Sequence, residues 1–144
     1  MMSTWVVVTD SRRARVFESS AADPALKEIK DLLNPLSHQQ VPDERGQGAA
    51  GRSGTQHGLE SRTQPKQHDA QQFVHEISSF LHKEHAANHF KDLLLVAAPE
   101  WVGHLQQALH DSVKAVMQKP VQKDLVHCTP AELLEQIKAF LKPH

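Results

Sequence analysis

The arginines are the residues of this sequence whose type and spacing first suggest chemistry. All six lie within the first 62 positions, and every later cation is a lysine or a histidine. A guanidinium group can donate paired hydrogen bonds to a phosphate, so clustered arginines predict contact with RNA or another phosphate-bearing surface. The predicted binding residues are Arg12, Arg13, Arg15, Arg45, Arg52, His57, Arg62 and Lys66. The alternative is a solvated loop, because the chain is almost neutral at −1 and its arginine-rich stretch holds no aromatic residue for base stacking.

Histidines form the second pattern. His68, His75, His82 and His89 recur every seven residues, and His85 lies between the last two. On a helix these positions fall opposite the apolar side, so the stripe is expected to face solvent. Histidines four residues apart can share a divalent ion, which makes His82, His85 and His89 weak metal candidates. A pH-sensitive surface is another reading. The simplest interpretation is a solvated helix face, so no metal and no cofactor is predicted.

Carboxylates give a weaker signal. Asp10 ends a predicted strand and Glu100 follows another, with Glu76 and Asp124 as further acids. In a ribonuclease-H-like sheet such acids could converge on Mg²⁺ and cleave phosphodiesters. Acids at strand ends more often cap turns, so a hydrolase acting on RNA or a tRNA ester remains the alternative rather than the main prediction.

The remaining reactive and aromatic residues predict packing, not catalysis. Cys128 lies beside His127, but neighbours in a strand point to opposite faces, so Cys128 is expected to be a small buried residue. Trp5 and Trp101 are expected in the core, with an interface role as the alternative for Trp101. No catalytic residue is predicted.

Composition places the chain among ordinary globular proteins. It has 144 residues, 39% of them hydrophobic and 23% charged, which favours one domain over residues 1–144. No apolar run approaches the roughly 18 residues of a membrane helix, and no secretory signal is visible. The single cysteine fits a reducing compartment. We therefore expect a cytoplasmic protein without membrane contact or DNA specificity, and the oligomeric state stays open.

Hydrophobic periodicity predicts the elements of the first half. Residues 4–9 form a β-branched run, residues 14–18 alternate, and residues 26–33 favour a third strand over a helix. A turn at 10–13 should join the first two strands. Five of the six glycines lie within 42–64, where apolar residues are almost absent, so a mobile Gly/Arg-rich loop is predicted at about 35–64. A helix should then begin after Pro65 and run from about Lys66 to Ala87.

The second half predicts alternating strands and helices. Residues 93–98 read as a central strand and residues 100–110 as a helix after Pro99. A last strand should come from 112–117, from 121–126, or from both. Thr129, Pro130 and Glu132 carry the signature of a helix start, followed by a C-terminal helix. The fold class is therefore α/β, a mixed sheet of about four to five strands with helices on its faces, in the order βββαβαβα.

These segments, in this order and spacing, resemble a known family. The matching pieces are residues 5–17 with ARVF at 14–17, GR at 51–52, PKQH at 65–68, LVAAP at 95–99, Gly103, Leu105 and KDL at 123–125. The chain resembles the bacterial family called "protein required for attachment to host cells", which is similar to the middle domain of archaeal and eukaryotic peptide-chain release factors. The resemblance implies a release-factor middle-domain fold over nearly the whole chain.

The resemblance does not imply release activity. Release factors hydrolyse peptidyl-tRNA with a Gly-Gly-Gln in the loop before the long helix, and this chain offers only GQG at 46–48 and GTQ at 54–56. The prediction is therefore a non-catalytic cytoplasmic protein that contacts RNA, a tRNA or ribosome, or a protein partner through the Gly/Arg-rich loop. A factor that acts in attachment to a host is a further alternative.

Overall fold

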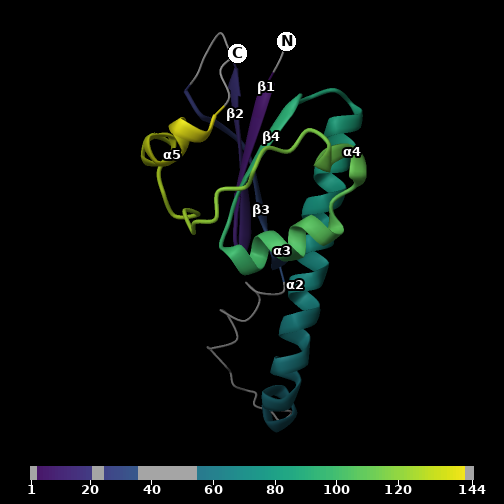
Figure 1. Cartoon of the computed structure of the whole chain (residues 1–144). Helices are drawn as coiled ribbons and strands as arrows, with labels where there is room; N and C mark the ends of the chain where they lie inside the picture. The colour runs from purple at the N-terminus through teal and green to yellow at the C-terminus, as the bar shows by residue number, and fades with distance from the viewer. Residues whose placement is uncertain (1–2, 21–24, 36–54, 142–144) are drawn as a thin grey trace.

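The protein is built around one mixed sheet of four strands in the order β3-β2-β1-β4 (Figure 1). The computed structural model describes residues 3–20, 25–35 and 55–141. The strands are β1 (Ser3–Thr9), β2 (Arg13–Ser20), β3 (Lys27–Leu33) and β4 (Asp92–Val96). β1 to β3 form an antiparallel meander, whereas β4 lies parallel to β1. The predicted α/β class with a mixed sheet is confirmed.

The turn between β1 and β2 forms for the reason that its residue types predict. The Asp10 carboxylate accepts hydrogen bonds from the backbone N–H groups of Arg12 (2.8 Å) and Arg13 (3.0 Å). The Thr9 hydroxyl donates to the carbonyl oxygen of Arg13 at 2.9 Å. An aspartate that bonds the backbone two and three residues further on fixes a tight turn. The same contacts set where β2 starts.

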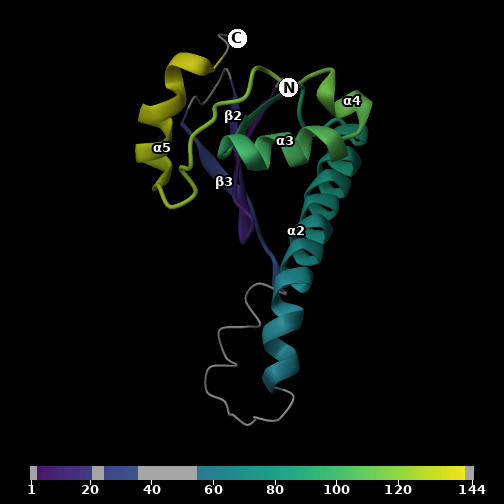
Figure 2. The ribbon, with the colours of Figure 1, turned by 60° about the horizontal axis from the view of Figure 1, so that its bottom comes forward.

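Alternate residues of β1 contribute to two cores, one on each face of the sheet. Trp5 and Val7 pack under α2 (Thr55–Ala86), α3 (Pro99–Ala108) and α4 (Asp111–Lys114), and we call this the α2 core. Val6 and Val8 pack against α5 (Pro130–Ile137) in the α5 core. Figures 1 and 2 show the two groups of helices on opposite sides of the sheet. The layers follow from strands that are apolar on both faces.

Helix α2 is longer than its sequence predicts. The prediction placed a loop up to residue 64 and a helix from about Lys66, but α2 begins at Thr55. A proline inside a helix removes one hydrogen bond, which is why Pro65 reads as a boundary. Adding turns to an anchored helix costs far less than nucleating a new one, and Glu60 and Arg62 are good helix formers. Residues 36–54 of the predicted loop lie outside the described residues.

The apolar face of α2 is as predicted where its side chains are described. Phe73, Val74, Ile77 and Leu81 are buried in the α2 core, and Phe80 packs at its edge. None of the helices within residues 3–20, 25–35 and 55–141 combines the length and apolar character needed to cross a membrane.

The far edge of β4 differs from the prediction. β4 is the last strand of the sheet, not a central one, and residues 111–114 form helix α4 instead of a strand. Met117 and Val121 only make isolated parallel bridges to Leu93 and Val96. Pro120 between them has no N–H to donate, so a continuous ladder cannot form. Within the described ranges the order therefore ends in helices, without the predicted last strand.

The start of α5 is confirmed as a capping box. The Thr129 hydroxyl accepts from the Glu132 N–H at 3.1 Å, and the Glu132 carboxylate accepts from the Thr129 N–H at 2.9 Å. Thr129→Ala removes one side of this exchange and should lower the free energy of unfolding by about 1 kcal/mol. Urea denaturation measures the change. Thr129→Ser keeps the hydroxyl and should leave stability within a few tenths of 1 kcal/mol; equal losses in both variants would contradict the capping role.

Candidate functional groove and cationic helix

A groove of about 1050 Å³ opens between α2 and α3, at the carboxyl ends of β1 and β4. Asp10 and Ser11 enter it from the end of β1, His75 from α2, and Glu100 and His104 from α3. In open α/β sheets, ligands bind outside the carboxyl ends of the parallel strands. Its position makes this groove a candidate functional site.

The structure brings Asp10 and Glu100 to the same groove, as the ribonuclease-H-like hypothesis requires. The Asp10 carboxylate is engaged in the turn before β2, and Glu100 lies exposed in the first turn of α3, where a negative charge is favourable. Glu76 and Asp124 are exposed and do not line the groove. Among residues 3–20, 25–35 and 55–141, no three histidine, cysteine or acidic side chains gather as a metal would need.

Two histidines, His75 and His104, also line the groove, and only the first is predicted from the sequence. His75 belongs to the predicted stripe, but His104 was not singled out. Its spacing of four residues from Glu100 and three from Gln107 places all three on one face of α3 and was the available signal. The groove contains two carboxylates, and neither lysine nor arginine is among its described lining residues. Its charge therefore favours a cation over a phosphate.

Trp101 holds the floor of the groove. Its side chain is buried at 7% exposure, and its indole N–H donates to the Thr9 hydroxyl oxygen at 3.2 Å. Phe73 of α2 packs against the indole with ring centroids 6.5 Å apart. The core prediction for Trp101 is confirmed, and the side chain joins the end of β1 to both helices.

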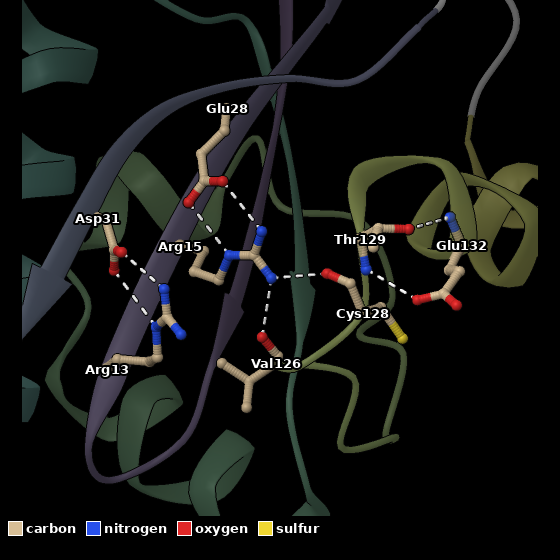
Figure 3. A network of polar contacts seen from close by, with 8 residues as sticks. All are labelled: Arg13, Arg15, Glu28, Asp31, Val126, Cys128, Thr129 and Glu132. Carbon is tan, nitrogen blue, oxygen red and sulfur yellow. Dashed lines mark hydrogen bonds and ion pairs between the residues drawn. The ribbon is translucent and has the colours of Figure 1, made fainter.

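Arg13 and Arg15 lie on the face of the sheet that carries α5, not on the face that carries α2. Arg13 pairs with Asp31 of β3 at 2.6 Å, and Arg15 pairs with Glu28 at 2.9 Å (Figure 3). Both pairs join β2 to β3. These ion pairs engage both arginines within the fold, on the α5 side of the sheet, because residues two apart on β2 share one face.

The Arg15 guanidinium also ties the chain before α5 to the sheet. It donates to the carbonyl oxygens of Val126 at 2.9 Å and Cys128 at 2.6 Å, and it lies 5.0 Å from the centre of the Phe17 ring. Its side chain is only 10% exposed. Hydrogen bonds to the Glu28 carboxylate raise the pKa of Arg15 above its ordinary value, against the opposing effect of burial. Cys128 itself is half-buried, not buried as predicted, and it lies in the irregular segment before α5, not in a strand.

Three of the predicted binding residues lie on the part of α2 that projects. Figures 1 and 2 show the first half of α2 extending beyond the sheet and beyond α3. This half carries His57, Arg62 and Lys66, and the last two are four residues apart, so their backbone positions share one side of the helix. Arg12 is exposed in the β1–β2 turn. Arg45 and Arg52 lie outside the described residues.

The histidine stripe breaks up at its end. His75 and His82 are exposed as predicted, and the ring of His82 stacks on His110 with centroids 3.9 Å apart. α2 ends at Ala86, so His85 and His89 are not four residues apart on one helix. His89 instead meets the Glu84 carboxylate at 2.5 Å, and His85 packs near Phe90. The proposed i,i+4 pair at His85 and His89 is therefore wrong.

Comparison with known proteins gives one family. The family described as "Protein required for attachment to host cells" matches residues 5–137. No curated protein matches the chain. A solved structure titled "Archaeal protein" is similar, with 11% identity and a TM-score of 0.49. The match covers 96% of this chain but only 38% of that one.

Proposed function

The chain belongs to the family of proteins required for attachment to host cells, and we propose that it is a non-catalytic protein that binds RNA with the projecting half of α2. The observation that carries the proposal is the early start of α2 at Thr55. A helix of 32 residues is roughly 48 Å long, and Figures 1 and 2 show its first half beyond the sheet and beyond α3. The half that carries Arg62 and Lys66 therefore projects from the body of the protein.

The placement of the two cations suits phosphate contact. Positions four residues apart on a helix share one side of it, and arginine with lysine can neutralise neighbouring phosphates. We further propose that the fold is similar to the middle domain of release factors, in which the functional loop also precedes a long helix. The proposal also includes a cytoplasmic location, where ribosomal RNA is the abundant target.

The groove argues against the hydrolase alternative. A nuclease must stabilise the negative charge that develops on the phosphoryl group, usually with cations or a metal. The two carboxylates of the groove could serve a nuclease only by holding such a metal, but the Asp10 carboxylate already accepts two hydrogen bonds from the backbone of the β1–β2 turn. No third histidine, cysteine or acidic side chain gathers with this pair among residues 3–20, 25–35 and 55–141. Binding without cleavage is the simpler function for this surface.

Salt dependence tests the RNA proposal. The double variant Arg62→Gln/Lys66→Gln removes two phosphate contacts and should reduce the slope of log affinity against log salt by about 1.4 for single-stranded RNA. Fluorescence anisotropy with a labelled single-stranded RNA, titrated at several salt concentrations, measures this slope. The matched control Lys83→Gln/Lys114→Gln removes two exposed cations elsewhere and should keep the slope of the unmodified protein. An affinity for the labelled RNA that does not change with salt concentration would contradict the proposal of RNA binding.

A sucrose gradient separates an RNA target from a protein target. Tagged protein from its native lysate is sedimented with and without ribonuclease. We expect co-migration with ribosomes that ribonuclease abolishes. Co-migration with a large particle that survives ribonuclease would mean a protein partner, and migration as a free small protein in both samples would count against the proposal.

A further inference from the structure

A second hollow, of about 440 Å³, lies near the amino-terminal end of β1, away from the groove. Its floor is aromatic, formed by Trp5 of β1 and Phe80 of α2. Its rim carries Glu18, Ile29, Lys30, Glu84 and His89, and His89 pairs with Glu84. The volume lies within the usual range for sites that hold small ligands. We call it the Trp5 pocket.

The aromatic floor of the Trp5 pocket is held rigidly. The Trp5 ring stacks on Phe80 with centroids 5.9 Å apart and on Phe90 at 4.7 Å. Its indole N–H donates to the Glu18 carboxylate at 3.3 Å. Trp5 is only 3% exposed, so the open face of the floor belongs to Phe80. The Phe80 ring, stacked on the fixed Trp5 ring, presents its negative face at no further cost in ordering.

The rim combines this ring with negative charge. Glu18 and Glu84 come from opposite sides of the pocket, one on β2 and one on α2. The only cation of fixed charge among the described lining residues is Lys30, whose ammonium group lies over the Phe80 ring, 5.9 Å from its centroid. The Lys30 ammonium shows which chemistry the ring face accepts, because aromatic faces attract cations.

The backbone of β3 shapes the mouth of the pocket. The pairing of β2 with β3 shifts register between Val16 and Phe17, which leaves Ile29 as an extra residue on β3. Such bulges re-aim side chains at functional sites. Ile29 is a large apolar side chain that is 38% exposed, and it lies at the rim beside Lys30. An apolar rim beside a cation-accepting ring fits a ligand that has both an ammonium group and a hydrocarbon part.

We infer that the Trp5 pocket binds an alkylammonium group, which displaces Lys30 from the face of Phe80. The Phe80 ring attracts the cation, and Ile29 covers its hydrocarbon part. The carboxylates of Glu18 and Glu84 supply the negative charge while they keep their contacts to the Trp5 indole N–H and to His89. The ammonium belongs either to a free organic cation or to a lysine side chain of a partner. The inference stands apart from RNA binding, because the pocket shares no residue with the projecting half of α2.

Variants with opposite expected effects test the inference. Lys30→Met removes the resident cation but keeps the hydrocarbon stem, so it should tighten binding about fivefold. Phe80→Leu removes the ring face and should weaken binding about fivefold. Glu84→Gln should weaken it about threefold to tenfold through the lost charge. Lys123→Met, an exposed lysine far from the pocket in sequence and not among its lining residues, is the matched control and should change nothing.

The probes are choline and N-acetyl-trimethyllysine methylamide, titrated while the Trp5 indole N–H signal is followed by NMR. A Trp5→Phe sample assigns that signal. Tighter binding of choline points to a free cation, and tighter binding of the lysine derivative points to a peptide side chain. Weaker or unchanged binding in Lys30→Met, or no shift of the Trp5 signal in the unmodified protein, would overturn the inference. A misfolded variant cannot imitate the expected pattern, because Lys30→Met must gain affinity.

Discussion

Replacing Arg15 by methionine is expected to lower the free energy of unfolding by about 3 kcal/mol and the Tm by roughly 6–12 °C. The variant keeps the hydrocarbon stem but removes the pair with Glu28 and the two hydrogen bonds to the carbonyl oxygens before α5. The Arg15 side chain is 10% exposed and its bond to the Val126 carbonyl oxygen is buried, whereas Glu28 is 30% exposed. Most of the expected loss therefore comes from the carbonyl oxygens that are left without a donor. Thermal and urea unfolding measure the loss.

Arg13 provides the control on the same strand and the same face. Its pair with Asp31 is more open, at 32% and 39% side-chain exposure. Arg13→Met should therefore cost only about 0.5 kcal/mol. The Arg15 variant should also speed hydrogen exchange of the α5 amides, because the segment before that helix loses its attachment to β2. Equal losses for the two arginines would show that burial does not separate their roles.

Replacing Trp101 by alanine is expected to cost about 4 kcal/mol. The side chain is buried between β1, α2 and α3, so its removal leaves a cavity that the surrounding residues cannot fill. Trp101→Phe keeps most of the volume and loses the hydrogen bond to Thr9, so it should cost about 1 kcal/mol. Urea denaturation with an unchanged m-value tests both. A loss of less than about 1 kcal/mol in the free energy of unfolding of Trp101→Ala would contradict the core role and favour an interface role for Trp101.

Local patterns predicted the parts of this fold that depend on near neighbours. The β-branched run of β1, the aspartate turn after it and the capping box of α5 each depend on residues within a few positions, and each is confirmed. The apolar face of α2 could also be predicted from the sequence, because its apolar residues repeat every three to four positions.

Features set by distant contacts could not be predicted in the same way. Arg15 looked like a ligand-binding arginine, but its partners include Val126 and Cys128, more than 100 positions away. The predicted start of α2 was wrong because the glycine and proline content favours a loop. Packing around Phe73 and Ile77 anchors the helix and lets it extend to Thr55. The Trp5 pocket draws on β1, β2, β3 and α2, so no window of sequence contains it.

The parallel pairing of β1 with β4 also governs the order in which the chain can fold during synthesis. β1, β2 and β3 are complete after 33 residues, but Thr4 pairs with Asp92. At roughly 5–20 residues per second, a ribosome needs on the order of 4–18 s to make the intervening chain. During that time the second edge of β1, with its valines, has no strand to pair with. Mutations that delay the docking of β4 should therefore reveal themselves first as aggregation of nascent chains, before any change in the finished protein.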